Sequence, residues 1–163
     1  MITGGADVVV HDREGRIVLV VEPKSRFDAT GDWAARTFRN LYAHGSVPDV
    51  PYFLLALPDA FYLWREPGRR ALEAFVNGRD GEEVPPDYAV PSWEIVRPYL
   101  GERDTPPHEV STYAMKMIVG AFVADVLNSD LSPDEAPDHL WWLFESGLYD
   151  AMRGGSFAGT VSS

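Results

Sequence analysis

Two apolar runs joined by a polar turn open the chain. Residues 7–12 and 16–22 are rich in Val, Ile and Leu, and residues 12–15 (Asp-Arg-Glu-Gly) separate them. Gly15 suits the positive φ that a short hairpin loop needs, so the pattern predicts an antiparallel hairpin. Residues 17–21 are apolar at every position. That run is typical of an interior strand covered on both faces.

A helix is predicted directly after the hairpin. Thr30 is a suitable N-cap for a helix over residues 31–43, and Gly45 is a suitable terminator. The side chains that recur at helical spacing, and that we expect to pack on the sheet, are Trp33, Ala34, Thr37, Phe38 and Leu41.

Two more apolar runs, 52–57 and 61–64, predict strands, and Pro58-Asp59 between them predicts a turn. Strand, helix and strand in this order imply a right-handed crossover, which places 52–57 parallel to the strand that ends at Glu22. We therefore expect an α/β fold (an α+β mixed sheet), in which an antiparallel hairpin and a parallel crossover strand are flanked by helices.

The stretch 67–109 carries weaker signals. Residues 69–76 predict a short helix, 77–91 a loop, and 93–100 a helical or extended segment. Prolines at positions 85, 86, 91, 98, 106 and 107 favour ordered loop that wraps the core over a second domain.

The C-terminal part predicts a helical pair. Ser111 or Thr112 caps a helix to about Leu127 that is apolar nearly all round, as buried or subunit-bridging helices are. Residues 132–135 (Ser-Pro-Asp-Glu) have the pattern of a cap, a first-turn proline and a capping-box acid, with a restart at Pro137. The stripe that we expect to be core, or alternatively a dimer interface, is Trp141, Phe144, Leu148 and Met152.

Gly154 and Gly155 end this helix and leave a Ser- and Gly-rich tail that we expect to be loose. The length predicts one domain over residues 1–163. Its expected parts are a core (1–66), a loop-rich wrap (67–109), C-terminal helices (110–155) and a loose tail (156–163).

Composition narrows the function classes. The net charge of −11 disfavours loose, charge-driven binding to nucleic acid or to anionic membrane. The absence of cysteine excludes disulfides and thiolate metal sites and favours a reducing cytoplasm. The first residues lack a signal-peptide pattern, and Asp125 interrupts the longest apolar run near the C-terminus too early for a membrane span. We expect a cytoplasmic protein with no membrane partner.

Several common sites have no support in the sequence. The four histidines show no paired ligand spacing, which disfavours zinc. The chain has neither a glycine-rich phosphate loop nor a nucleophile elbow, so an NTPase or a serine hydrolase is not indicated.

Charged residues gather at one end of the predicted hairpin. Asp7 opens the first strand, and Glu22 and Lys24 close the second. Residues two apart on a strand share a face, roughly 7 Å apart, and a hairpin brings the start of one strand beside the end of the other. Two acids and a lysine there suit a metal site with a charged helper, with solvated strand ends as the alternative. Pro23 lacks an N–H, so we expect lost pairing or an outward kink.

This order of elements resembles the PD-(D/E)XK, or restriction-endonuclease-like, nuclease superfamily. The resemblance covers about Asp7 to Glu66 and includes Val-Leu-Val-Val-Glu-Pro-Lys at 18–24. Two further stretches, Asp-Trp-Ala-Ala-Arg at 32–36 and Pro-Tyr-Phe-Leu-Leu-Ala-Leu-Pro-Asp-Ala-Phe-Tyr-Leu-Trp at 51–64, are similar to small uncharacterised bacterial members.

The resemblance implies a nuclease-like core in which acids matching Asp7 and Glu22 hold a divalent ion, Mg²⁺ or Mn²⁺. The ion would polarise a phosphodiester and lower the pKa of the attacking water. Lys24 would position that water or stabilise charge on the phosphate. The expected substrate-binding residues are Arg26, Arg36 and Arg39.

Two hypotheses follow from the sequence. The first is a metal-dependent nuclease whose partner is nucleic acid. The second is a non-catalytic interaction protein on the same scaffold, which binds a basic protein or mimics nucleic acid. Its grounds are the net charge of −11, Pro23 and the few residues before Asp7. In either case we expect the C-terminal helices or a partner chain to cover the second face of the sheet, with a homodimer through those helices as one arrangement.

Overall fold

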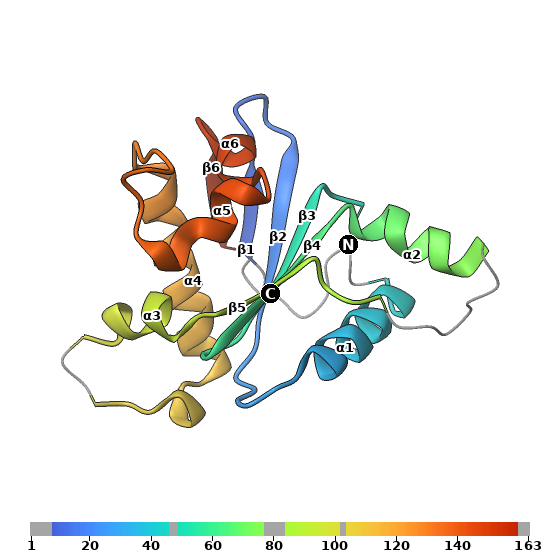
Figure 1. Cartoon of the computed structure of the whole chain (residues 1–163), viewed down its shortest axis with the longest axis horizontal. Helices are drawn as coiled ribbons and strands as arrows, with labels where there is room; N and C mark the ends of the chain where they lie inside the picture. Colours follow the sequence, from blue (N-terminus) through green and yellow to red (C-terminus); the bar gives the residue numbers. More distant parts are fainter. Residues whose placement is uncertain (1–7, 46–48, 77–83, 102–103, 160–163) are drawn as a thin grey trace.

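The chain is organised around a mixed β-sheet with helices on both faces, seen in a computed structural model that describes residues 8–45, 49–76, 84–101 and 104–159 (Figure 1). The strand order is β5-β4-β3-β2-β1-β6. The strands are β1 (Val8–His11), β2 (Ile17–Pro23), β3 (Tyr52–Ala56), β4 (Ala60–Arg65), β5 (Tyr88–Pro91) and β6 (Ser156–Gly159). Only the β2–β3 pair among these neighbours is parallel, so the predicted mixed α/β class is confirmed.

The predicted hairpin is confirmed. In the β1–β2 pair, Val8 lies opposite Val21. Gly15 in the turn has a φ of +84°. The Asp12 carboxylate accepts hydrogen bonds from the backbone N–H groups of Glu14 (2.9 Å) and Arg16 (3.0 Å). The bond from the Arg16 backbone is the main reason that the pKa of Asp12 lies below its usual value.

The predicted crossover is also confirmed. Helix α1 spans Gly31–Ala43, and the Thr30 hydroxyl caps it by accepting from the Trp33 backbone N–H at 3.1 Å. The helix buries Phe38 against the sheet, where the Phe38 ring stacks on Trp64 with 4.8 Å between centroids. β3 then runs parallel to β2, from Leu19 opposite Tyr52 to Pro23 opposite Ala56. This arrangement places the carboxyl ends of β2 and β3 side by side.

The C-terminal helices cover the second face, as expected. Helix α4 (Thr112–Leu127) is capped by the Ser111 hydroxyl, which accepts from the Ala114 backbone N–H at 3.1 Å. Its neighbours on this face are α3 (Trp93–Val96), α5 (Trp141–Glu145) and α6 (Leu148–Met152). Phe61 of the sheet contacts Phe122 and Trp142 edge-on, so sheet and helices share one apolar core.

The stretch 67–109 is more regular than predicted. It contains α2 (Pro67–Val76), η1 (Arg97–Leu100) and η2 (Pro107–Glu109) as well as α3 and β5. The predicted loop over 77–91 is wrong at its end, where β5 lies; residues 77–83 lie outside the described residues. Long-range contacts position this strand: the Asp87 backbone N–H donates to Leu63 O (2.8 Å), and the Arg70 guanidinium binds the Asp87 carboxylate (2.7 Å).

The predicted helix start at 132–135 is wrong. Ser132 Oγ donates to Glu135 Oε1 at 2.8 Å, but the segment forms an isolated turn, and η3 (Asp138–Leu140) follows Pro137. Gly147, with a φ of +84°, separates α5 from α6. The predicted single stripe is therefore interrupted, and Trp141 is 47% exposed whereas Trp142 is buried.

The tail was predicted to be loose, and this is wrong for residues 156–159, which form β6 and pair antiparallel with β1; residues 160–163 lie outside the described residues. The chain reaches β1 through Gly155, where a Cβ would lie 2.0 Å from the carbonyl oxygen of His11. Only a residue without a side chain allows this close approach.

We predict that Gly155→Ala lowers the free energy of unfolding by more than about 2 kcal/mol, because the added methyl group collides with backbone rather than with a movable side chain. Urea unfolding measures the change. Gly31→Ala is the matched control: a Cβ there meets nothing within 4 Å, and the change should be within about 1 kcal/mol. Equal effects of the two substitutions would contradict the assigned role of Gly155.

Candidate active site at the carboxyl ends of β2 and β3

Glu22 and Lys24 lie at the carboxyl end of β2, a strand between β1 and β3. Alternation along the strand directs both side chains to the face that carries Val20, which belongs to the core under α1. Both side chains are half-buried. Carboxyl ends of neighbouring parallel strands are where α/β folds place ligands.

Pro23 does not interrupt this part of the sheet. It is buried within β2 opposite Ala56, and the Lys24 backbone N–H donates to Ala56 O at 3.0 Å. In this register the hydrogen bond to β3 comes from the residue after the proline, so the missing N–H costs the β2–β3 pair nothing. The predicted loss of pairing is therefore wrong on the β3 side.

None of the described residues neutralises either charged group at this strand end. Within the described ranges, the Glu22 carboxylate and the Lys24 ammonium have no hydrogen-bond or ion-pair partner. Half-buried charges usually find partners, because partial burial weakens their hydration. Among the described residues, nothing competes with a ligand for these two groups.

The predicted metal pair is described only in part. Asp7 lies outside the described residues, although β1 begins at Val8, opposite Val21, one residue before Glu22. Within the residues that the structure describes, no three His, Asp or Glu side chains are grouped to hold a metal ion. A single carboxylate with free oxygens still suits Mg²⁺, which binds through one or two carboxylates and keeps several waters. The donor chemistry of Glu22 fits such an ion.

Asp59 holds the loop that follows Lys24. It lies in the predicted turn after Pro58, and its Oδ2 accepts a hydrogen bond from the Asp28 backbone N–H at 3.1 Å. That bond supports the positive φ of Asp28, +57°. Asp59 Oδ1 is buried and has no hydrogen-bond partner among the described residues. The turn places a carboxylate with an unused oxygen at this end of the sheet.

A second bond ties the same loop to β4. The Tyr62 hydroxyl donates to Ala29 O at 3.2 Å. Burial raises the pKa of Tyr62, and the negative charge of Asp59 raises it further. Tyr62 therefore stays protonated as a donor, and the loop between Lys24 and α1 is anchored at both Asp28 and Ala29.

The three predicted substrate-binding arginines are placed differently. The Arg26 guanidinium lies over the Trp33 ring, 5.2 Å from its centroid, so it is held at the first turn of α1. Arg36 is exposed one turn further along the same side of the helix. Arg39 is also exposed and lies roughly 9 Å along the helix axis from Trp33. Of the three arginines, Arg26 lies nearest to Lys24 along the chain, two residues after it.

One aromatic pair beside this loop was not found from the sequence. The Phe27 ring, 41% exposed, meets His108 of η2 edge-on, with 6.0 Å between centroids. His108 also lies 3.6 Å from the Glu109 carboxylate. The two rings come from distant parts of the chain, and no motif spacing connects them. This contact joins the segment that follows Lys24 to η2.

Comparison of the chain with protein-family models, with curated proteins and with solved structures finds no match. Among the described residues, no helix is both long enough and apolar enough to cross a membrane.

We predict that Asp59→Ala frees the loop that precedes α1. Losing the acceptor for the Asp28 N–H should lower the free energy of unfolding by about 1 kcal/mol and speed hydrogen exchange at Asp28. Urea unfolding and amide exchange measured by NMR check this. Asp134→Ala, at an exposed turn, is the control and should change neither quantity. Unchanged exchange at Asp28 in Asp59→Ala would contradict the anchoring role.

Proposed function

We propose that this chain is a metal-dependent phosphodiester hydrolase of the PD-(D/E)XK type. One observation carries the proposal: Glu22 and Lys24 sit half-buried at the carboxyl end of an interior strand, without a partner among the described residues. The hairpin, crossover helix and parallel strand around them follow the order of elements that the sequence resemblance implies.

In this proposal Glu22, together with Asp7, holds Mg²⁺ or Mn²⁺. The bound ion supplies a Lewis acid for the phosphate and an acidified water. The Lys24 ammonium, roughly 7 Å along the strand from Glu22, donates to the attacking water or to a non-bridging phosphate oxygen. Because Lys24 is anchored through its backbone N–H to Ala56, its side chain starts from a rigid position.

Arg26 is the arginine best placed to hold the substrate backbone. Its contact with Trp33 limits the motion of the guanidinium while leaving N–H donors free for a phosphate. Arg36 extends the positive charge along α1. These local cations offset part of the net charge of −11 where a polyanion would approach.

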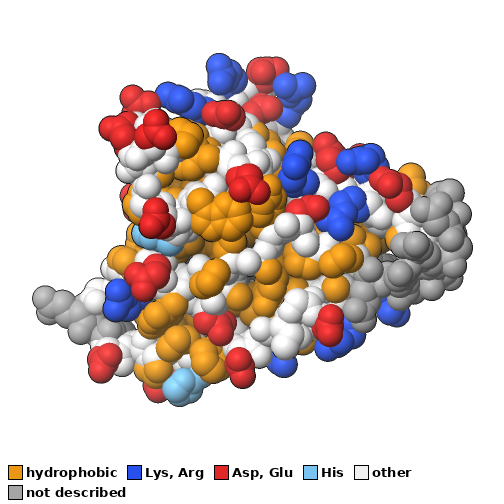
Figure 2. Space-filling view, viewed as in Figure 1, with side chains coloured by type: hydrophobic (Ala, Val, Ile, Leu, Met, Phe, Trp, Pro, Cys, Tyr) orange, Lys and Arg blue, Asp and Glu red, His pale blue; other side chains and the backbone are white. Residues whose placement is uncertain are grey.

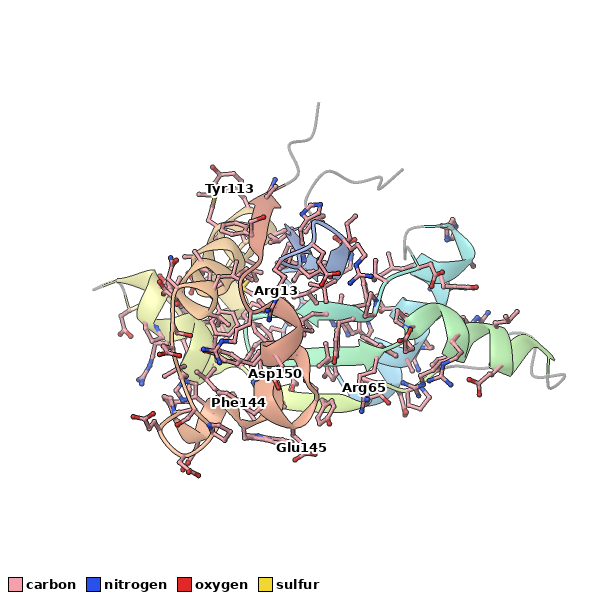
Figure 3. All side chains as sticks on the ribbon, turned by 90° about the horizontal axis from the view of Figure 1, so that it is seen from above. Arg13, Arg65, Tyr113, Phe144, Glu145 and Asp150 are labelled. Atoms are coloured by element: carbon pink, nitrogen blue, oxygen red, sulfur yellow. The ribbon has the colours of Figure 1, made fainter. Side chains whose placement is uncertain are left out.

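The second candidate function is a non-catalytic interaction protein on this scaffold. The observation that favours it is an exposed apolar strip on α4, where Tyr113 and Met117 are 73% and 57% exposed (Figure 3). Figure 2 shows further apolar side chains among interspersed acids and bases on one broad face of the molecule. A protein of this kind would bind a partner and cleave nothing.

We predict Mg²⁺- or Mn²⁺-dependent cleavage of labelled DNA or RNA, resolved on denaturing gels. Lys24→Ala should lower the cleavage rate about 100-fold or more, because it removes a charge aimed at the transition state. Glu22→Gln should also lower the cleavage rate. It should abolish the line broadening that Mn²⁺ causes in NMR signals around residue 22, because an amide binds Mn²⁺ far more weakly than a carboxylate does.

The matched controls lie at the other end of the same hairpin. Arg13→Ala and Glu14→Gln remove the same kinds of charge from the exposed β1–β2 turn and should leave cleavage and Mn²⁺ binding unchanged. A folded protein that cleaves no single- or double-stranded DNA or RNA with either ion would reject the proposal in favour of the interaction protein. Full activity in Lys24→Ala would reject the assigned mechanism.

A further inference from the structure

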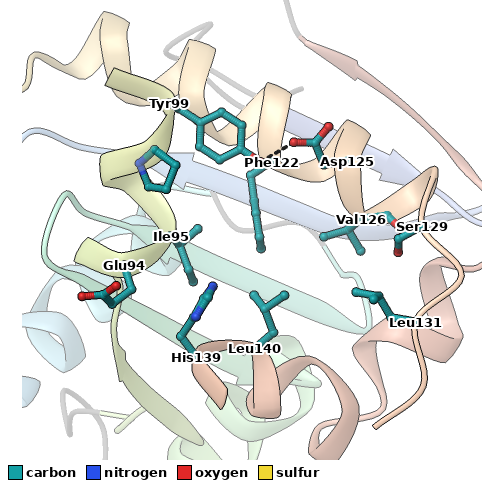
Figure 4. Close-up of a pocket in the computed structure, with 11 residues that line it drawn as sticks. Glu94, Ile95, Tyr99, Phe122, Asp125, Val126, Ser129, Leu131, His139 and Leu140 are labelled. Atoms are coloured by element: carbon teal, nitrogen blue, oxygen red, sulfur yellow. Dashed lines mark hydrogen bonds between the residues drawn. The ribbon is translucent and has the colours of Figure 1, made fainter. Parts of the chain in front are cut away.

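A cavity of about 320 Å³ lies on the opposite face of the sheet from Glu22 and Lys24 (Figure 4). Its walls come from α3 and η1, from the second half of α4, and from the segment 129–140. This volume is at the lower end of the range of small-molecule pockets. No part of the proposed active site contributes to it.

The floor of the cavity is apolar. Ile95, Phe122, Val126 and Leu140 line it, and each belongs to the main core on this face of the sheet. Because these side chains are buried by packing that does not involve a ligand, the floor is preformed. An apolar group that enters the cavity leaves water without requiring the core to rearrange.

The wall above this floor is acidic. The Tyr99 hydroxyl donates a hydrogen bond to Asp125 Oδ2, while Asp125 Oδ1 accepts none from the described residues. Burial, and then the hydrogen bond to Asp125, raise the pKa of Tyr99, so this hydroxyl remains a donor that orients the carboxylate. The edge of the cavity thus presents an exposed carboxylate that Tyr99 orients, with one oxygen that no described residue binds.

A second acid, Glu94, also lines the cavity. Glu94 lies at the rim and is 3.6 Å from Arg97, and both side chains are mostly exposed to solvent. The titratable side chains in the lining are Glu94, Tyr99, Asp125 and His139, and the lining includes no lysine and no arginine. An anionic ligand would find no countercharge in the wall, whereas a cation would meet Asp125.

We propose that this cavity binds a small amphiphilic amine, with its aromatic or branched apolar group on the floor and its ammonium against Asp125. The ammonium donates to the Asp125 oxygen that no described residue binds. The occupant is limited to one or two rings by the volume of about 320 Å³. The site is independent of the proposed hydrolase function.

The test compares tryptamine, which carries an ammonium, with tryptophol, its neutral hydroxyl isostere, by isothermal titration calorimetry at pH 7. We expect wild type to bind tryptamine more tightly. Asp125→Asn should weaken tryptamine binding about fivefold, since the carboxylate is exposed to solvent, and leave tryptophol binding within about twofold. Asp134→Asn removes an exposed acid that does not line the cavity and should change neither affinity.

A cavity-filling variant locates the binding. Leu131→Trp places a large ring into the lining and should abolish binding of both ligands while circular dichroism reports an unchanged fold. Equal affinity of wild type for the two ligands, absence of saturable binding, or an equal effect of Asp125→Asn and Asp134→Asn would each overturn the proposal. If a variant fails to fold, the affinities of the wild-type protein for tryptamine and tryptophol still test the proposal.

Discussion

The parallel pairing of β2 and β3 is the constraint on which the rest of the structure depends. A parallel pair needs a crossover, and α1 supplies it while burying Phe38 against Trp64. The pair also decides where charge gathers, because Glu22, Lys24 and the β3–β4 turn are brought to one end. The bond from the Lys24 N–H to Ala56 O keeps this end in register directly after Pro23.

The loop between β2 and α1 shows how the candidate site is kept in shape. It leaves the sheet at Lys24, and Asp59 and Tyr62 of the neighbouring hairpin hold it at Asp28 and Ala29. Arg26 within it rests on Trp33. Each of these contacts joins residues from different elements, so the loop has a definite conformation even though it carries several charges. A rigid surround is what positioned catalysis requires.

The two faces of the sheet carry different features. The α1 face carries the candidate hydrolase site, and the opposite face carries the main core and the cavity beside Tyr99 and Asp125. The sheet separates the two sites, so a ligand in the cavity would touch neither Glu22 nor Lys24. The α4 helix links the cavity to the exposed strip at Tyr113, because it lines one and carries the other.

The sequence by itself determined the elements whose signals are local. The hairpin and the caps at Thr30 and Ser111 follow from patterns among near neighbours in the sequence, and the crossover follows from the order of consecutive elements; each is present. Periodicity and capping depend on residues that are close together in the sequence, so such elements can be predicted from the sequence alone. The placement of Glu22 at the end of an interior strand could also be predicted, because the apolar run that precedes it is a local pattern.

Tertiary structure alone decided the rest. β6 exists because Gly155 lets the chain reach β1, and β5 exists because Asp87 is bound by Leu63 and Arg70, partners that no local pattern reveals. The meeting of Phe27 with His108, and of Tyr99 with Asp125, likewise depends on how distant segments pack. A short apolar or Gly-rich stretch takes its conformation from the surface it covers, and that surface forms only when the chain has folded.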